Sequence, residues 1–435
     1  MEALAPSPSK LERNVTISLP VASIEAEINA RLKRISRTAK MPGFRPGKVP
    51  FNIVINQYGY QVRQEVMTDA VTQTFSAEVQ KANLRVAGYP NFTPLDAGAE
   101  ADKFQFNATF EVYPDVTLGS LAGSPLEQLS GDVAAADVDK TINTLRKQRA
   151  TFDKTDRASE LGDFVVLDFE GKIDGAVFPG GAAENFSMVL GEGRMLPDFE
   201  SALYGMKGGD KKSFDLTFPA DYAAELAGKT AQFSVTAKIV NAPILPDVDA
   251  TFAKSLGVAD GNVEIMRDEI KTNLARELKK RIQLRTKDQV MNALLATATL
   301  DLPRALVDSE IGRLQDQAVK DMAERGMAAK DIQLPPDLFV EQAEKRVKLG
   351  LVLNDVVKQH NLRATPEQIR AVIEEHAESF EDPKQMVKWY YSDESRLREV
   401  EGAVLEDNVV DWAVKQMAVT AVAKSFDEIM EIKRQ

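Results

Sequence analysis

One stretch of the chain, Met41–Pro50, places an aromatic side chain and two cations between prolines and glycines. Three prolines and two glycines in ten residues cannot continue a helix or fill a central strand, so we expect a stiff loop. Phe44 and Arg45 lie at its centre, and Lys48 follows. Phenylalanine and arginine often anchor interfaces, so the chemistry indicated here is binding through a rigid tip.

The charge around this loop differs from that of the whole chain, whose formal net charge is −12. No acidic residue occurs between Glu27 and Glu65. The interval contains Arg31, Lys33, Arg34, Arg37, Lys40, Arg45, Lys48 and Arg63. Clustered cations are the electrostatic footprint of a phosphate-rich partner, although charge runs also occur on solvated turns. Composition alone leaves the two interpretations level.

The region 151–245 is rich in aromatic residues. Strand-like runs at 164–169, 186–190, 212–216 and 233–237 are separated by glycine turns, with one short helix near 198–204. We therefore expect a small antiparallel sheet wrapped on one helix. The aromatic side chains could form a plain core, which the pattern alone favours, or a pocket.

The spacing of these residues is similar to that of the FKBP-type prolyl isomerases. The similarity runs through Asp168-Phe169-x-Gly171, Asp174-Gly175-x-x-Phe178, Phe186, Gly191-x-Gly193-x-Met195-Leu196-x-x-Phe199-Glu200, Gly208 to Lys211, Phe218-Pro219-x-x-Tyr222 and Phe233. It implies a catalytic pocket lined by Phe169, Phe178, Phe186, Met195, Leu196, Phe199, Tyr222 and Phe233.

In this resemblance Phe199 forms the pocket floor. The backbone N–H of Leu196 and the hydroxyl of Tyr222 receive substrate carbonyls. Pro179 stands where many relatives have an aspartate, which leaves the rate of isomerisation open. Twisting an X–Pro bond requires no nucleophile or metal, because a dry aromatic pocket stabilises the less polar twisted amide. A pocket that only binds proline remains an alternative.

Composition excludes several other chemistries. The 435 residues include no cysteine and only two histidines, which excludes disulfides and thiol chemistry and disfavours a Ser–His hydrolase. There is no apolar run of about 18 residues and no basic, apolar leader at the N-terminus, so we expect a cytoplasmic protein without a membrane span. Gly43-x-x-x-Gly47-Lys48 lacks the Ser/Thr of a P-loop. We assign no cofactor and no metal.

The N-terminal region alternates apolar residues over 11–19 and again over 104–112, which predicts two strands. Between them, Ile24, Ile28, Leu32 and Ile35 mark one helix, and a second is expected over about 60–81. Residues 1–114 are thus expected to form a compact α+β domain with the basic loop where its helices meet.

Residues 115–150 read as a connector with one helix near 137–152, and residues 246–435 show only helical patterns. Thr365-Pro366-Glu367-Gln368 predicts a helix start. The C-terminal helices could bury their apolar stripes completely, or could leave adaptable, methionine-containing surface open for unfolded chains. The sequence leaves these two possibilities level.

Gly43-Phe44-Arg45-x-Gly47-x-x-Pro50 resembles the ribosome-docking signature of the trigger factor family, and the domain order resembles that family over essentially the whole chain. The resemblance implies a multidomain α+β fold: a ribosome-binding α+β domain at 1–114, a connector at 115–150 that packs with the C-terminal body, an FKBP-like antiparallel sheet on one helix at 151–245, and an all-α chaperone domain with arms at 246–435.

The same resemblance implies an ATP-independent chaperone that docks at the exit tunnel of the large ribosomal subunit, against protein and rRNA. Docking would use Gly43, Phe44, Arg45, Gly47, Lys48 and Pro50. Nascent and unfolded polypeptides would be its other partners, with a homodimer off the ribosome left open. Two alternatives are a dedicated prolyl isomerase with targeting domains, whose flanks would not suppress aggregation, and an RNA- or ribosome-binding translation factor, which would bind naked RNA with a steep salt dependence.

Overall fold

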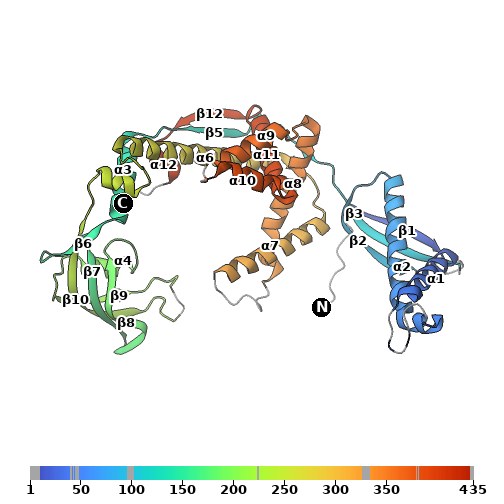
Figure 1. The fold of residues 1–435 in the computed structure, drawn as a ribbon, viewed down its shortest axis with the longest axis horizontal. Helices are drawn as coiled ribbons and strands as arrows, with labels where there is room; N and C mark the ends of the chain where they lie inside the picture. Colours follow the sequence, from blue (N-terminus) through green and yellow to red (C-terminus); the bar gives the residue numbers. More distant parts are fainter. Residues whose placement is uncertain are drawn as a thin grey trace. The chain divides into compact units, whose positions relative to one another are not determined.

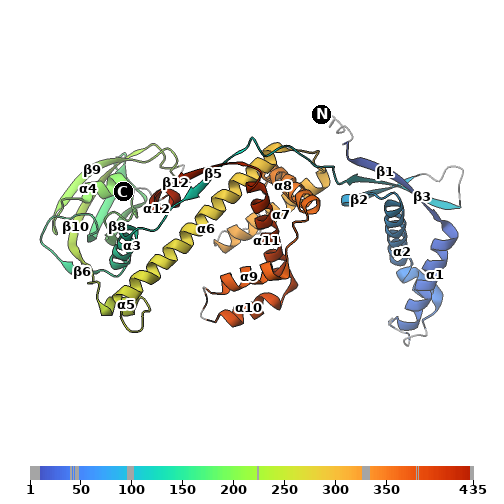
Figure 2. The same ribbon diagram turned by 90° about the horizontal axis from the view of Figure 1, so that it is seen from above.

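The computed structural model describes residues 10–39, 42, 44, 49–95, 102–222, 225–325, 334–378, 380 and 382–431. The chain divides into two compact units, each built from segments far apart in the sequence. One unit combines Met1–Gln128 with Leu284–Ala421, and the other combines Leu129–Gln283 with Val422–Gln435. Figures 1 and 2 show the elements of each unit in two views.

The N-terminal part of the first unit is a three-stranded antiparallel sheet with two helices. The strands are β1 (Glu12–Pro20), β2 (Val86–Leu95) and β3 (Lys103–Val112), in the order β1-β3-β2. The helices are α1 (Val21–Thr38) and α2 (Phe51–Lys81), whose apolar stripes pack with the sheet into one core. Phe75 of α2 makes edge contacts with Phe92 and Phe110 from the sheet.

The expected strands β1 and β3 and the first helix are confirmed, but two expectations for this region were wrong or incomplete. Helix α2 begins at Phe51 rather than near Tyr60, because its first turn contributes the fully buried Val54. Strand β2 was not expected, since it contains Pro90 and Pro94. It lies at the sheet edge, with an irregularity between Ala87 and Asn91, where missing N–H donors are tolerated.

The remainder of the first unit is mainly helical. It contains the C-terminal part of α6 (Val263–Thr297), then α7 (Arg304–Glu324), a 3-10 turn at Pro336–Leu338, α8 (Val340–His360), α9 (Pro366–Ala377), α10 (Pro383–Tyr391) and α11 (Glu394–Val414). The pair β4 (Thr117–Leu118) and β11 (Ala298–Thr299) ties the connector to the end of α6. The predicted start of α9 is confirmed, because Thr365 and Gln368 form a reciprocal capping box.

The second unit holds a five-stranded antiparallel sheet and one short helix. Its strands are β6 (Thr151–Lys154), β7 (Phe164–Ile173), β8 (Ala176–Val189), β9 (Lys211–Thr217) and β10 (Thr230–Ile244). The order is β6-β10-β7-β8, with β9 on β10. Helix α4 (Pro197–Leu203) packs its buried Phe199 and Leu203 into the core of this sheet. The expected small sheet wrapped on one helix is confirmed, although β6 was not foreseen.

The same unit also contains α3 (Ala135–Gln148), α5 (Ala250–Ser255) and the first part of α6, which share a core around Val138, Ile142 and Phe252. Helix α12 (Phe426–Met430) packs on α6 through Phe426 and Ile429. Strands β5 (Pro125–Ser130) and β12 (Ala418–Ala423) pair into a two-stranded sheet, and each strand begins in the first unit and ends in the second.

Within the described ranges, none of the helices combines the length and the apolar character that crossing a bilayer requires. Those ranges also contain no group of three His, Asp or Glu side chains placed to hold a metal ion.

Candidate functional site

The sheet and α4 of the second unit enclose a cavity of about 720 Å³. Its lining consists of Phe169, Phe178, Pro179, Gly180, Ala183, Phe186, Gly193, Arg194, Met195, Leu196, Pro197, Phe199, Leu216, Phe218, Tyr222, Leu226 and Phe233. All eight residues that the sequence assigned to a pocket are in this lining. They are therefore brought together, rather than dispersed through a closed core.

Alternation along two neighbouring strands explains how the aromatic walls are placed. Phe169 of β7 and Phe233 of β10 point to the inner face of the sheet, where both are largely buried. Helix α4 brings Phe199 against them, with ring centroids 5.5 Å from Phe169 and 5.3 Å from Phe233. Phe199 is only 1% exposed, as a floor residue must be. Edge-to-face contacts of this kind hold the rings in fixed orientations.

Two polar groups of the lining residues have no hydrogen-bond partner among the described residues. Leu196 is the N-cap residue of α4, and its backbone N–H has no acceptor within the described part of the chain. The Tyr222 side chain is 45% exposed, and its hydroxyl likewise has no partner among the described residues. A bound peptide could satisfy both groups, which are the groups the resemblance assigned to substrate carbonyls.

Several lining residues were not singled out from the sequence. Pro179 and Gly180 follow Phe178 in the lining, so these two positions supply no carboxylate to the cavity. Arg194 is the one charged residue among the described residues of the lining. Phe218 stood in the quoted motif beside Tyr222, and their rings are 5.1 Å apart. The position of Phe218 in that motif was the sequence signal that could have assigned it to the cavity wall.

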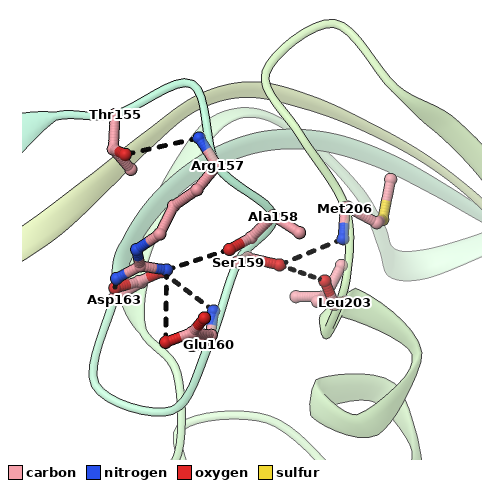
Figure 3. A network of polar contacts seen from close by, with 8 residues as sticks. All are labelled: Thr155, Arg157, Ala158, Ser159, Glu160, Asp163, Leu203 and Met206. Carbon is pink, nitrogen blue, oxygen red and sulfur yellow. Dashed lines mark hydrogen bonds and ion pairs between the residues drawn. The ribbon is translucent and has the colours of Figure 1, made fainter.

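The loop before β7, which contains Thr155 to Asp163, contacts the C-terminal end of α4 (Figure 3). The buried Ser159 hydroxyl donates to the Leu203 carbonyl at 2.6 Å and accepts from the Met206 N–H at 3.1 Å, which satisfies the C-terminal end of α4. Arg157 forms two hydrogen bonds of 2.7 Å with the buried Asp163 carboxylate, and these raise the pKa of the guanidinium further above its usual range. The pocket floor thus rests on a fixed polar frame.

The structure describes only Pro42, Phe44, Val49 and Pro50 of the proline-rich loop, Met41–Pro50. Phe44 is 40% exposed, and Pro50 is an exposed N-cap residue of α2. The predicted docking residues Gly43, Arg45, Gly47 and Lys48 lie outside the described residues. The one aromatic side chain of the loop is therefore accessible.

The cations around the loop are partly neutralised by acidic residues of α1 and α2. Arg31 pairs with Glu27 and with Asp69 at 2.7 Å, Arg34 with Glu27, and Arg63 with Glu25. The pKa of Arg31 is raised, chiefly by its hydrogen bond to Asp69 and next by its hydrogen bond to Glu27. Lys33 and Arg37 have no ion pair within the described residues. The linear sequence therefore overstated the local excess of positive charge.

Together, the sheet wrapped on α4, its aromatic cavity and the helical region define a multidomain protein with a prolyl isomerase domain of the FKBP type. The FKBP-type peptidyl-prolyl cis-trans isomerase family matches residues 155–238. The family of the bacterial trigger factor protein matches residues 1–145, and that of its C-terminus matches residues 262–415.

Full-length relatives agree with these matches. The trigger factor of Nitrosospira multiformis is 52% identical over 97% of each chain, and that of Dechloromonas aromatica is 50% identical over 100% of each. A solved structure of the trigger factor chaperone covers 96% of this chain and 100% of its own, with a TM-score of 0.46 and 17% identity. This chain belongs to the trigger factor family.

Membership of the family confirms the multidomain α+β reading and makes the chain a chaperone with an FKBP-type peptidyl-prolyl isomerase domain. Ribosome binding and unfolded-chain substrates are implied by the family. Neither alternative, a dedicated isomerase or a translation factor, is favoured.

Proposed function

We propose that the cavity lined by Phe169, Phe178, Phe186, Met195, Leu196, Phe199, Tyr222 and Phe233 is the site at which this chaperone isomerises X–Pro bonds. One observation carries the proposal. The cavity is walled mainly by aromatic and aliphatic side chains, yet Leu196, whose backbone N–H has no acceptor among the described residues, belongs to its lining. A pocket of this composition accepts a proline ring while fixing the adjacent backbone.

The mechanism follows from the electronic structure of the amide. The barrier to rotation, about 18–20 kcal/mol, arises because twisting destroys amide resonance. The twisted amide is less polar, so the rings of Phe169, Phe199 and Phe233 stabilise it relative to the planar ground state. The Leu196 N–H and the Tyr222 hydroxyl hold substrate carbonyls during the rotation. No proton is transferred and no bond is broken.

We propose that the N-terminal domain docks the chaperone at the exit tunnel of the large ribosomal subunit, through Gly43, Phe44, Arg45, Gly47, Lys48 and Pro50. The exposure of Phe44 supports this role. Lys33 and Arg37, which have no ion pair among the described residues, lie in the part of α1 that leads into the loop and would add attraction to rRNA phosphates. Docking of this kind places the work of the protein in the cytoplasm.

We also propose four domains with separate roles: residues 1–114 for ribosome binding, 115–150 as the connector, 151–245 for isomerisation and 246–435 as the helical chaperone region. The core shared by α3 with α5 and α6 supports assigning the connector helix to the C-terminal body. Whether two copies associate off the ribosome is left to measurement of the molecular mass in solution.

The pocket assignment is tested with two substitutions that spare the buried floor. Phe186→Ala removes a half-buried wall residue, and Tyr222→Phe removes only a hydroxyl. We expect kcat/KM for a proline peptide to fall about tenfold or more for Phe186→Ala and about two- to tenfold for Tyr222→Phe. Prevention of aggregation of an unfolded client should persist in both. Wild-type isomerisation by Phe186→Ala would refute the assignment.

A further inference from the structure

Glu200 is one of three polar side chains that are buried among the described residues, together with Ser159 and Asp163. Ser159 serves the end of α4, and Asp163 pairs with Arg157. Glu200 differs from Asp163, because no cation pairs with it within the described ranges. Burial of a carboxylate without a cation is unfavourable, so the other groups that stabilise Glu200 beside the pocket floor Phe199 must be identified.

The reason lies in the turn that precedes α4. One carboxylate oxygen of Glu200 accepts the backbone N–H of Gly191 at 2.9 Å, and the other accepts the N–H of Met195 at 3.3 Å. These two donors lie at the two ends of a turn in which Gly191 and Gly193 both have positive φ. A single side chain therefore closes the turn from inside the domain.

The closed turn leads directly into the cavity. Met195 and Leu196 both contribute to the lining, and the N–H of Leu196 is the donor left without an acceptor among the described residues. Fixing the Met195 N–H constrains the peptide plane before Met195, and the start of α4 constrains the chain after Leu196. The direction of the Leu196 N–H is then set between two restrained points.

We propose that Glu200 is the positioning residue of the isomerase site: its carboxylate, held by the Gly191 and Met195 N–H groups, aims the Leu196 N–H at the substrate carbonyl. The inference rests on the proposed function of the cavity. Glu200 does not touch the substrate. It acts through the turn, and both of its oxygens are needed, because each serves one end.

Two variants separate this role from simple packing. In Glu200→Gln, one oxygen can still accept an N–H, but the amide NH₂ faces the second N–H donor. Glu200→Leu removes both acceptors while filling a similar volume in an apolar core. Glu192→Gln makes the same chemical change at an exposed position of the turn, outside the cavity lining, and is the matched control.

We expect kcat/KM for a proline peptide to fall about three- to tenfold in Glu200→Gln and further in Glu200→Leu, with kcat carrying most of the loss. Amide exchange, measured by NMR on the full chain, should accelerate at Gly191 or Met195 in Glu200→Gln, which keeps one acceptor, and at both residues in Glu200→Leu. Amides of β7 and β10 should keep their wild-type protection, and Glu192→Gln should match wild type in every readout.

Wild-type kcat/KM in Glu200→Gln would overturn the inference. So would accelerated exchange throughout β7 and β10, since that would show a general structural role. The result with Phe186→Ala shows whether the pocket assignment itself is wrong or only the positioning role of Glu200. If that variant loses isomerisation and Glu200→Gln does not, the pocket stands and only the positioning role falls. If Phe186→Ala retains activity, both fall.

Discussion

The carboxylate of Glu111 on β3 accepts a hydrogen bond of 2.8 Å from the backbone N–H of Ala305, in the first turn of α7. The N-cap position of α7 is Pro303, which provides no side-chain cap. The N-terminal sheet therefore supplies the cap that the helix itself lacks. Gly88 of β2 lies so close that a Cβ there would meet the Cβ of Ala305 at 2.5 Å. This contact ties the N-terminal domain to α7 within the first unit.

Replacing Glu111 by alanine should remove this cap. We expect the variant to lose about 1 kcal/mol of stability in urea unfolding, in line with other N-cap deletions, and the Ala305 amide proton to exchange faster. Asp115→Ala, which removes an exposed acid four residues later, serves as control and should unfold like wild type. Unchanged protection of the Ala305 amide in Glu111→Ala would show that the hydrogen bond contributes nothing in solution.

Gly171 of β7 provides a purely steric test of the pocket. A Cβ at this position would lie 2.6 Å from Cε1 of Phe233 and 3.0 Å from Cε1 of Phe178, so Gly171→Ala must displace these rings. We expect a loss of about 1–3 kcal/mol of stability and a parallel fall in isomerisation. Gly402→Ala on α11 meets no atom within 4 Å and should instead stabilise the protein slightly. A fully active Gly171→Ala would mean that the ring positions are unimportant.

Acid should weaken the sheet of the isomerase domain through Asp168. The ammonium group of Lys238, 2.7 Å away, and next the backbone N–H of Asn185 lower the pKa of this carboxyl. Because the folded-state pKa is the lower one, the stabilisation is complete above about pH 4 and is lost as the pH falls through the folded value. Asp168→Asn should reduce the slope of stability against pH in that acidic range and leave it unchanged near neutrality. If thermal unfolding at several acidic pH values gave Asp168→Asn and wild type the same slope of stability against pH, this prediction would be contradicted.

The sequence predicted the features that depend on neighbours along the chain. Alternation identified β1 and β3, and the capping box placed the start of α9 at Thr365, because both signals are local. The early start of α2 was missed, since the helix was expected only over about 60–81, whereas the helix begins at Phe51 and its first turn includes the buried Val54.

Features that depend on the folded chain could not be predicted in this way. The Arg31–Asp69 ion pair joins positions 38 residues apart, so the cationic interval appeared less compensated than it is. The two N–H donors that surround Glu200 converge only after the turn has formed. Its position beside Phe199 in the motif marked the residue, but not its hydrogen bonds.

The exposed Phe44 leads to the last prediction. An aromatic anchor at the centre of an interface commonly contributes about 2 kcal/mol or more, so Phe44→Ala should weaken co-sedimentation with ribosomes by about thirtyfold or more. Tyr60→Ala is a suitable control, because Tyr60 is an aromatic residue of the same domain that is 80% exposed on α2. Both variants should retain wild-type isomerisation, since neither residue belongs to the cavity lining. If Phe44→Ala pelleted with ribosomes as wild type does while Tyr60→Ala did not, the docking surface would have to be moved from the proline-rich loop to the face of α2.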